Sequence, residues 1–233
     1  MKSVKAPLCP RCRGMKVVRN GVKRNGRQNF LCRGCKKQFQ TEYVYKGCEA
    51  KNKELVIKLL CRGSGIRDCE AVSGVSHSTV LKWIRQTAAD IVLKPKNHSY
   101  DRVQIDEQWS YVERKDKKVW MLYAYAEKED EIIAFTMGKR SAATVRNLWI
   151  KLKELDIEWF LTDDWKAFKM VLPKTRHLVG KVFTKAIEGV NTFFRTRSRR
   201  LMRRTVCFSK RLLYHYSMMK MIVFYRNQRA SYI

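Results

Sequence analysis

Four of the eight cysteines form two Cys-x-x-Cys pairs near the start of the chain. Nineteen residues separate the Cys9–Cys12 pair from the Cys32–Cys35 pair. Each pair on a tight turn directs two thiolates to one point, and four thiolates make the closed tetrahedral shell that structural zinc prefers. We therefore expect one structural Zn²⁺, bound by these four cysteines in a zinc-ribbon-like module over residues 1–47. The alternative is a loop region with unpaired buried cysteines.

A second set of residues suited to chemistry is acidic and lies in the middle of the chain. Asp106 and Glu107 fall within a strand-like segment, and Asp163 and Asp164 directly follow another, at residues 157–162. Side chains alternate across a strand, so Asp106 and Glu107 are expected on opposite faces and only one of them can serve a given site. The carboxyl end of a strand is where α/β proteins commonly build sites.

Glu188 is the only acid among residues 184–233. On a helix Glu188, Asn191 and Arg195 stand at i, i+3 and i+7 and share one face, while apolar residues form the stripe beside them. Glu188 is therefore a candidate third carboxylate. From the residues alone, a simple ion-pair partner among the twelve cations of this segment is an equally open reading.

Residues 48–92 have a helical period. The Gly74-Val75-Ser76 link combines a turn glycine with a serine N-cap, as a helix-turn-helix requires. The second helix of that motif would present four residues to DNA bases and phosphates, namely His77, Ser78, Thr79 and Lys82. The alternative is a three-helix packing unit without DNA contact.

The net charge of +29 is unevenly distributed. Residues 1–100 hold 22 Lys and Arg against 6 acids (+16), residues 101–183 hold 16 against 14 (+2), and residues 184–233 hold 12 against 1 (+11). Basic flanks around an acidic middle suit an enzyme that holds metal ions against DNA. Six arginines of the last segment are expected to form a phosphate-binding track, with a solvated helix face as the alternative: Arg195, Arg197, Arg199, Arg200, Arg203 and Arg204.

The remaining pattern predicts the elements that position these residues. Three strands at 103–112, 119–126 and 132–137 suggest an antiparallel meander, followed by a helix, a buried strand and two final helices at 185–204 and 209–226. The expected plan is multidomain: a zinc module (1–47), a helix-turn-helix (48–92), a linker (93–102) and an α/β domain with a central mixed sheet (103–233). No membrane span or signal-peptide run is evident, so a cytoplasmic, nucleoid-associated protein is expected.

Three segments together resemble the transposases of the insertion sequence one family. They are Asp-Glu-Gln-Trp-Ser-Tyr-Val at 106–112, Leu-Thr-Asp-Asp-Trp at 161–165 and Ile-Glu-Gly-Val-Asn-Thr-Phe-Phe-Arg at 187–195. The cysteine pairs, Asn20-Gly21, Gly26-Arg-Gln28 and Phe30-Leu31 precede them, so the resemblance runs from Cys9 to about Tyr216. The motifs are specific together, although each alone is weak.

The resemblance implies an RNase H-like catalytic domain with a DDE triad of Asp106, Asp163 and Glu188, in which Arg195 matches a basic residue two turns after the glutamate. The triad would hold two catalytic Mg²⁺ ions, for which Mn²⁺ can substitute. The helix-turn-helix would bind the terminal inverted repeats of the element. Two positions depart from the family pattern: Asp164 replaces a usual glycine, and Glu70 a usual small residue. We expect Asp163, rather than Asp164, to be the metal ligand.

The implied activity is cleavage and strand transfer on double-stranded DNA by a homo-oligomer assembled in a synaptic complex. Water exposes a 3′-hydroxyl at the end of the element, and that hydroxyl attacks target DNA. Two other functions remain open from the sequence: a non-catalytic zinc and helix-turn-helix regulator, and an RNase H-like nuclease or resolvase that cuts without joining.

Overall fold

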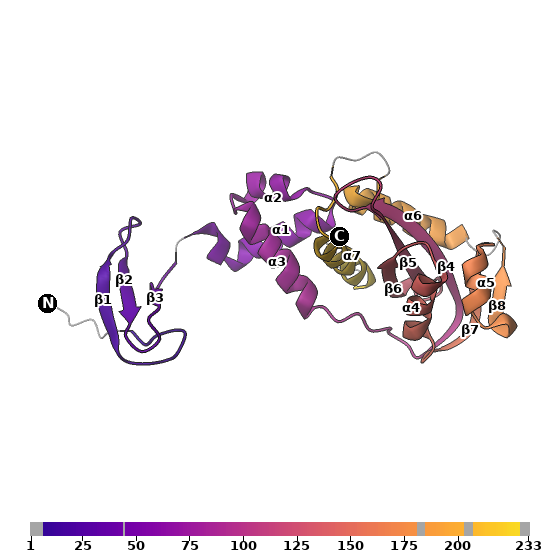
Figure 1. Ribbon diagram of the computed structural model, residues 1–233, viewed down its shortest axis with the longest axis horizontal. Coiled ribbons are helices and arrows are strands. Elements are labelled where there is room, and N and C mark those ends of the chain that lie inside the picture. The colour runs from indigo at the N-terminus through magenta and orange to yellow at the C-terminus, as the bar shows by residue number, and fades with distance from the viewer. Residues whose placement is uncertain (1–6, 44, 181–184, 203–206, 229–233) are drawn as a thin grey trace. The chain divides into compact units, whose positions relative to one another are not determined.

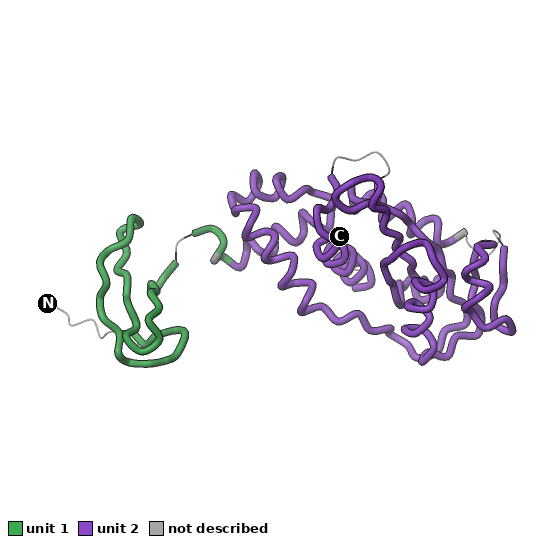
Figure 2. The backbone as a smooth tube through the Cα atoms, in the orientation of Figure 1, with its two compact units in different colours: residues 1–49 green, residues 50–233 purple. Residues whose placement is uncertain are grey.

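The computed structural model describes residues 7–43, 45–180, 185–202 and 207–228. The chain divides into two compact units, residues 1–49 and 50–233 (Figure 2). Each unit has its own hydrophobic core.

The first unit is a three-stranded antiparallel sheet in the order β1-β2-β3 (Figure 1). Its strands are β1 (Val17–Val22), β2 (Gln28–Cys32) and β3 (Gln38–Phe39), and a short 3₁₀ helix, η1 (Lys46–Cys48), follows them. Phe30 and Phe39 stack with ring centroids 5.7 Å apart and form most of the small core, together with Val17 and two cysteines. A core of this size gives little stability without a further cross-link.

The second unit begins with three helices, α1 (Ala50–Cys61), α2 (Ile66–Ser73) and α3 (His77–Asp90). Gly74 ends α2 with a φ of 66°, a left-handed conformation that favours glycine. Ser76 then begins α3, and its hydroxyl accepts a hydrogen bond from the Thr79 N–H. The expected turn between two helices is therefore present.

A five-stranded mixed sheet in the order β6-β5-β4-β7-β8 forms the centre of the second unit. The strands are β4 (Ser99–Tyr111), β5 (Lys118–Ala126), β6 (Glu131–Gly138), β7 (Asp156–Thr162) and β8 (His177–Val179). The first three form the expected antiparallel meander, while β7 and β8 continue the sheet in parallel. β4 begins at Ser99, four residues before the predicted start, because Ser99 pairs with Asp156 at the beginning of β7.

Helices cover both faces of this sheet (Figure 1). α4 (Ala142–Leu152) and α5 (Lys166–Val171) pack on one face, and the short 3₁₀ helix η2 (Lys174–Arg176) leads into β8. α6 (Lys185–Arg197) and α7 (Leu212–Asn227) pack on the other, where α1 and α3 join the same core. The chain thus returns at its C-terminal end to the helices that precede the sheet.

The predicted helix at 185–204 is wrong in its length, because α6 ends at Arg197. Ser198 adopts an extended conformation, and a 3₁₀ helix, η4 (Arg199–Leu201), follows. This break turns Leu201 inward, where it is 3% exposed, and the Ser110 hydroxyl donates a hydrogen bond to the carbonyl of Arg200. Arg203 and Arg204 lie outside the described residues.

Candidate zinc module and active site

The two cysteine pairs lie on turns of the same geometry. A residue with positive φ follows each pair, Arg13 at 56° and Lys36 at 57°. The N–H of the first cysteine of each pair donates to the carbonyl five residues later, from Cys9 to Gly14 and from Cys32 to Lys37. Equivalent turns aim equivalent ligands, as a site with two Cys-x-x-Cys halves requires.

The sulfur atoms of these cysteines meet at one point. All four lie within 4.8 Å of one another, with Cys9 and Cys35 at 3.6 Å and Cys12 and Cys32 at 3.5 Å. Four sulfurs about 2.3 Å from a zinc ion would lie about 3.8 Å apart in a tetrahedron, so the set fits zinc. The Cys12 N–H lowers the pKa of the Cys9 thiol to about 6, and the Cys35 N–H lowers that of Cys32. Both shifts favour the thiolate that metal binding requires, whereas the Gly14 N–H lowers the pKa of Cys12 but its neighbours Cys32 and Cys9 raise it to about 11, as expected of thiols crowded at one point.

Asp106 and Asp163 lie on neighbouring parallel strands. The β4–β7 register pairs Gln104 with Leu161, and two residues further along it brings Asp163, just after β7, level with Asp106. Burial raises the pKa of Asp106, and the negative charge of Asp163 raises it further against the lowering effect of two hydrogen bonds. A carboxylate in the middle of β4 beside one that directly follows the end of β7 can attract a divalent cation.

A buried polar network fixes the orientation of Asp106. The Asn191 amide on α6 donates to Asp106 Oδ2 at 2.6 Å, and the Glu107 N–H donates to Oδ1 at 2.7 Å. The Asn191 carbonyl oxygen accepts in turn from Tyr123 at 2.8 Å and from Gln108. The sequence placed Asn191 on the face of Glu188 but assigned it no role, and Tyr123 and Gln108 were not singled out. Gln108 stands two residues after Asp106 on β4, and this spacing alone predicts that both side chains lie on the same face of the strand.

Asp163 and Asp164 differ in their surroundings. Asp163 is half-buried, and its Oδ1 accepts the Trp165 N–H at 3.0 Å. Asp164 is exposed and forms an ion pair with Lys169. Asp163 is therefore held in a fixed orientation beside β4, whereas Asp164 faces a surface cation.

Glu188 lies in the first turn of α6, three residues before Asn191, and its side chain is exposed. Within the described residues, the four cysteines are the only group of three or more His, Cys, Asp or Glu side chains gathered closely enough for one metal ion. Glu188 is thus on the same helix as Asn191 but is not brought into one ligand set with the two aspartates. Arg195 is also exposed, and its charge lowers the pKa of Asp106, so it lies on the same side of the molecule.

Glu107 faces away from α6 and binds Arg140. The Arg140 Nε and Nη2 both donate to Glu107 Oε1, at 3.0 and 2.6 Å, and the Glu107 side chain is only 7% exposed. The guanidinium lies over the rings of Trp165 and Trp120, 4.5 and 5.1 Å from their centroids. Alternation along β4 thus places Asp106 and Glu107 on opposite faces, as expected. Glu107 does not face solvent, because its side chain is buried against Arg140.

The residues expected to contact DNA on α3 lie at its exposed N-terminal end. His77, Ser78 and Lys82 are exposed, and Thr79 is half-buried because it takes part in the Ser76 cap. Glu70 on α2 accepts the backbone N–H of His77 at 3.0 Å, so the residue that departs from the family pattern stabilises the start of α3.

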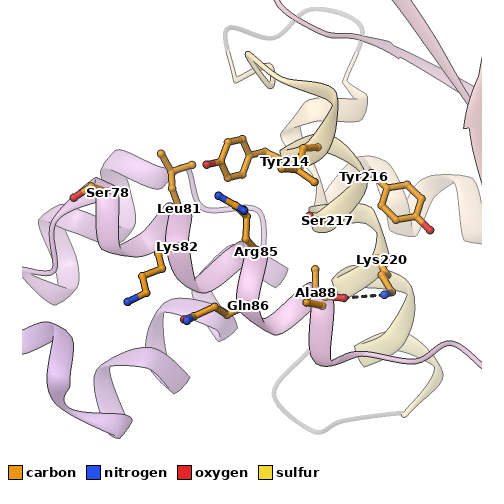
Figure 3. A pocket seen from close by; sticks show the side chains of 12 residues that line it. Ser78, Leu81, Lys82, Arg85, Gln86, Ala88, Tyr214, Tyr216, Ser217 and Lys220 are labelled. Carbon is orange, nitrogen blue, oxygen red and sulfur yellow. Dashed lines mark hydrogen bonds between the residues drawn. The ribbon is translucent and has the colours of Figure 1, made fainter. Parts of the chain in front are cut away.

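α7 limits how much of α3 is free. The two helices line a groove with three cations, Lys82, Arg85 and Lys220, and Lys220 donates to the carbonyl of Ala88 at 2.8 Å (Figure 3). In Figure 3 the side chains of Leu81 and Tyr214 extend toward one another. α7 thus covers part of α3, whereas His77, Ser78 and Lys82 near its start and Arg85 and Gln86 further along it remain exposed.

The C-terminal arginines do not form one helical row. Arg195 and Arg199 are exposed, while Arg197 and Arg200 are half-buried. Arg200 donates to the Ser209 hydroxyl at 3.0 Å, so part of its role is to hold the segment after α6. Arg199 lies 3.8 Å from Asp68 on α2.

No helix in the described part of the chain is both long and apolar enough to cross a bilayer. A family model described as IS1 transposase matches residues 102–231, and one for the zinc ribbon of the InsA N-terminal domain matches residues 1–36. The first match covers more than half of the chain.

Curated relatives agree with the family models. The chain is 41% identical over 112 residues to insertion element iso-IS1n protein InsB of Shigella dysenteriae, which covers 48% of this chain and 86% of that protein. It is 31% identical over 137 residues to insertion element IS1 9 protein InsB of Escherichia coli strain K12. That match covers 59% of this chain and 82% of the relative. A solved structure of a simian T-cell lymphotropic virus intasome with PP2A regulatory subunit B56 gamma matches at 10% identity over 74% of this chain and 65% of that chain. Its TM-score of 0.37 is too low to bear on the fold.

These matches agree with the four-cysteine cluster at the start of the chain and with the mixed sheet that carries the paired aspartates. They also decide against the non-catalytic regulator that the sequence left open. The chain belongs to the IS1 transposase family, as a DDE transposase with an N-terminal zinc ribbon.

Proposed function

We propose that Asp106, Asp163 and Glu188 form the catalytic triad of an RNase H-like domain that cuts and joins DNA at the ends of an insertion sequence. The observation that carries this proposal is the register of β4 and β7, which makes Asp106 and Asp163 neighbours. The hydrogen bond from Asn191 to Asp106 supports the third member, because it ties the helix of Glu188 to the same carboxylate.

The donor set suits hard divalent cations. Carboxylate oxygens are the protein ligands that Mg²⁺ prefers, and the mutual repulsion of Asp106 and Asp163 would be relieved by a cation between them. Two bound Mg²⁺ ions, or Mn²⁺ in their place, would activate the attacking oxygen and stabilise the leaving oxygen. Glu188 lies on α6, three residues before Asn191, and would complete the ligand set.

The chain's own groups bind and orient the DNA. Arg195 contacts a phosphate beside the aspartates, a role for which its planar fork is suited. Water attacks the phosphorus at the end of the element, and the bond from phosphorus to the 3′ oxygen breaks. The resulting 3′-hydroxyl then attacks a phosphodiester of target DNA in the same site, and it becomes bonded to that phosphorus as the target strand's own 3′ oxygen leaves, so no covalent protein–DNA link is needed.

Residues outside the triad recognise the ends of the element. α2 and α3 act as a helix-turn-helix on the terminal inverted repeats, through the residues His77, Ser78, Thr79 and Lys82. The zinc ribbon assists this binding, and the arginines 195, 197, 199, 200, 203 and 204 follow the phosphate backbone. A homo-oligomer brings two ends together. The modules correspond to residues 1–47, 48–92 and 103–233, with 93–102 as the linker.

The test of the triad is cleavage of a labelled duplex that carries the terminal sequence of the element, in Mg²⁺ and in Mn²⁺. Asp106→Asn, Asp163→Asn and Glu188→Gln are each expected to abolish cleavage and strand transfer while retaining DNA binding, because one site performs both steps. Asp164→Asn is the matched control and should retain activity, since Asp164 pairs with Lys169 at the surface. Substantial Mg²⁺-dependent cleavage by Glu188→Gln would remove Glu188 from the triad. Cleavage without strand transfer by the unmodified chain would favour a nuclease or resolvase.

A further inference from the structure

A cluster of aromatic and charged side chains adjoins the proposed active site on the face of β4 opposite Asn191. It consists of Glu107, Arg140, Trp120 and Trp165, which come from four separate elements of the chain. Trp120 and Trp165 pack against the hydrophobic core, whereas Arg140 remains 41% exposed although its partner Glu107 is only 7% exposed.

This cluster is connected to both aspartates. The backbone N–H of Glu107 binds Asp106, and the backbone N–H of Trp165 binds Asp163. Asp163 is also near enough for its charge to raise the pKa of Glu107, although burial raises that pKa more. Arg140 therefore stands beside Glu107 of β4 and beside Trp165, just after the end of β7, where the proposed chemistry occurs.

Arg140 is also held rigidly in place. Its Nε and Nη2 donate to Glu107 Oε1, and its guanidinium lies over two indole rings, those of Trp120 and Trp165. An arginine fixed by stacking and by one carboxylate has lost its side-chain entropy before any ligand arrives. No described residue accepts a hydrogen bond from its Nη1, so this edge retains free donors.

We propose that Arg140 binds a DNA phosphodiester next to the one that is cut, and that Glu107, Trp120 and Trp165 are the positioning residues that aim it. The proposal rests on the function proposed above for Asp106 and Asp163. An acidic site that binds DNA must overcome the repulsion between its carboxylates and the DNA phosphates. A fixed guanidinium helps to do so, because it offers planar, charge-assisted hydrogen bonds to phosphate oxygens. Lysine has a flexible stem and cannot reproduce that geometry.

The first measurement is the single-turnover rate of cleavage at saturating DNA. Arg140→Ala should slow cleavage about 100-fold, the usual cost of losing one fixed donor in an active site. Arg140→Lys should be intermediate. Arg146→Ala, which removes an exposed arginine on α4, is the matched control and should cleave at the unmodified rate.

A chemical substitution in the DNA separates phosphate binding from a merely structural role. Each phosphate within a few positions of the cleavage site is replaced in turn by an uncharged methylphosphonate. At the position that Arg140 contacts, the substitution should slow the unmodified chain but have little further effect on Arg140→Ala, because contacting groups show non-additive effects. If the two effects multiply at every position, Arg140 binds no phosphate and the proposal is overturned.

The positioning role is tested by combination. Glu107→Ala should slow cleavage, Glu107→Gln should slow it less because an acceptor for Arg140 remains, and Glu107→Ala with Arg140→Ala should be no slower than the slower single variant. If the rate losses of the two single variants multiply in the double variant, Glu107 does not act through Arg140 and its positioning role is contradicted. Failure of the proposed triad is distinguishable, because it would appear as cleavage by Asp106→Asn or Asp163→Asn, whatever the behaviour of Arg140.

Discussion

Asn191 is the residue on which the geometry of the candidate site most depends. It is buried, and it joins α6 to β4 by donating to Asp106 while it accepts from Tyr123 and Gln108. An amide suits this role, because its carbonyl oxygen and its NH₂ group can serve acceptor and donor partners at once. Its orientation is therefore set by the partners on the carbonyl side, and that orientation in turn fixes Asp106.

Asn191→Ala is expected to reduce cleavage about 10- to 100-fold, the usual effect of removing the partner that orients a metal ligand. The matched control is Thr192→Ala, which removes a neighbouring exposed hydroxyl on the same helix. Single-turnover cleavage rates with circular dichroism of both variants check the result. A folded Asn191→Ala variant that cleaves at the unmodified rate would contradict the orienting role.

His215 on α7 makes stability depend on pH. It is 1% exposed, its Nδ1 has no partner within the described residues, and burial, aided by the charge of Arg200, lowers its pKa to about 4. In the unfolded chain a histidine takes up its proton at about pH 6.5. The unfolded state therefore binds more protons between about pH 6.5 and 4, so the free energy of unfolding falls as pH falls through that window.

His215→Leu is expected to weaken this dependence. From pH 7 to pH 5 the unmodified chain should lose about 2 kcal/mol more free energy of unfolding than the variant does. Urea unfolding at both pH values measures the difference. Equal losses in the two proteins would show that His215 titrates alike in the folded and unfolded chain.

At the scale of elements, β4 carries a polar ladder that packs against the C-terminal segment. Gln104 accepts the Ile187 N–H, Asp106 and Gln108 bind Asn191, and Ser110 donates to the carbonyl of Arg200. All four lie at alternate positions on one face of the strand. Gln104, Gln108 and Ser110 are buried despite their polarity, because each has a partner on α6 or just after it.

Gln104→Leu is expected to loosen the start of α6. It removes the acceptor of the Ile187 N–H and leaves a buried donor unpaired, which costs about 1–3 kcal/mol. Amide hydrogen exchange at residues 186–190 should accelerate, whereas Gln86→Leu, on the exposed side of α3, should leave it unchanged. Unchanged protection in Gln104→Leu would show that Gln104 does not hold the helix.

The strands and helices of the second unit followed largely from hydrophobic period, but their partners did not. Alternation placed Asp106 and Glu107 on opposite faces, which the contacts with Asn191 and Arg140 confirm. The same alternation gives Gln104 and Gln108 the appearance of solvent-facing residues, since period alone does not distinguish water from a polar partner. The sequence does not predict the end of α6, because no residue near Ser198 strongly disfavours a helix. The helix ends where the burial of Leu201 requires a change of chain direction, and that burial depends on tertiary contacts.

At the scale of the whole molecule, α7 determines how the second unit is built. Met218, Met219, Met221, Ile222 and Val223 are all at most 1% exposed and cover more than one face of the helix, so from Met218 onward it must be enclosed. The apolar residues of this helix are enough to predict from the sequence that it is buried. It does not reveal that α1 and α3, more than a hundred residues earlier, supply part of the enclosure, because such pairing depends on tertiary contacts between distant segments.

The last prediction concerns the independence of the two units. Among its described residues the first unit has a core of only five buried side chains, two of which are candidate zinc ligands, whereas the second unit has two extensive cores of its own. Zinc should therefore supply the folding energy of the first unit and contribute nothing to the second. The full chain should bind one zinc ion.

Cys32→Ser with Cys35→Ser in the full chain should abolish zinc binding and remove the melting transition of the first unit, while the transition of the second unit stays at the same temperature. Cys61→Ser is the reciprocal control, because Cys61 is buried in the core shared by α1, α3 and α7. It should keep the zinc ion but lower the melting temperature of the second unit, since it places a hydroxyl in an apolar core. Metal analysis and scanning calorimetry measure both effects. Retained zinc in the double variant would refute the four-cysteine site, and a shifted second transition would show that the units are energetically coupled.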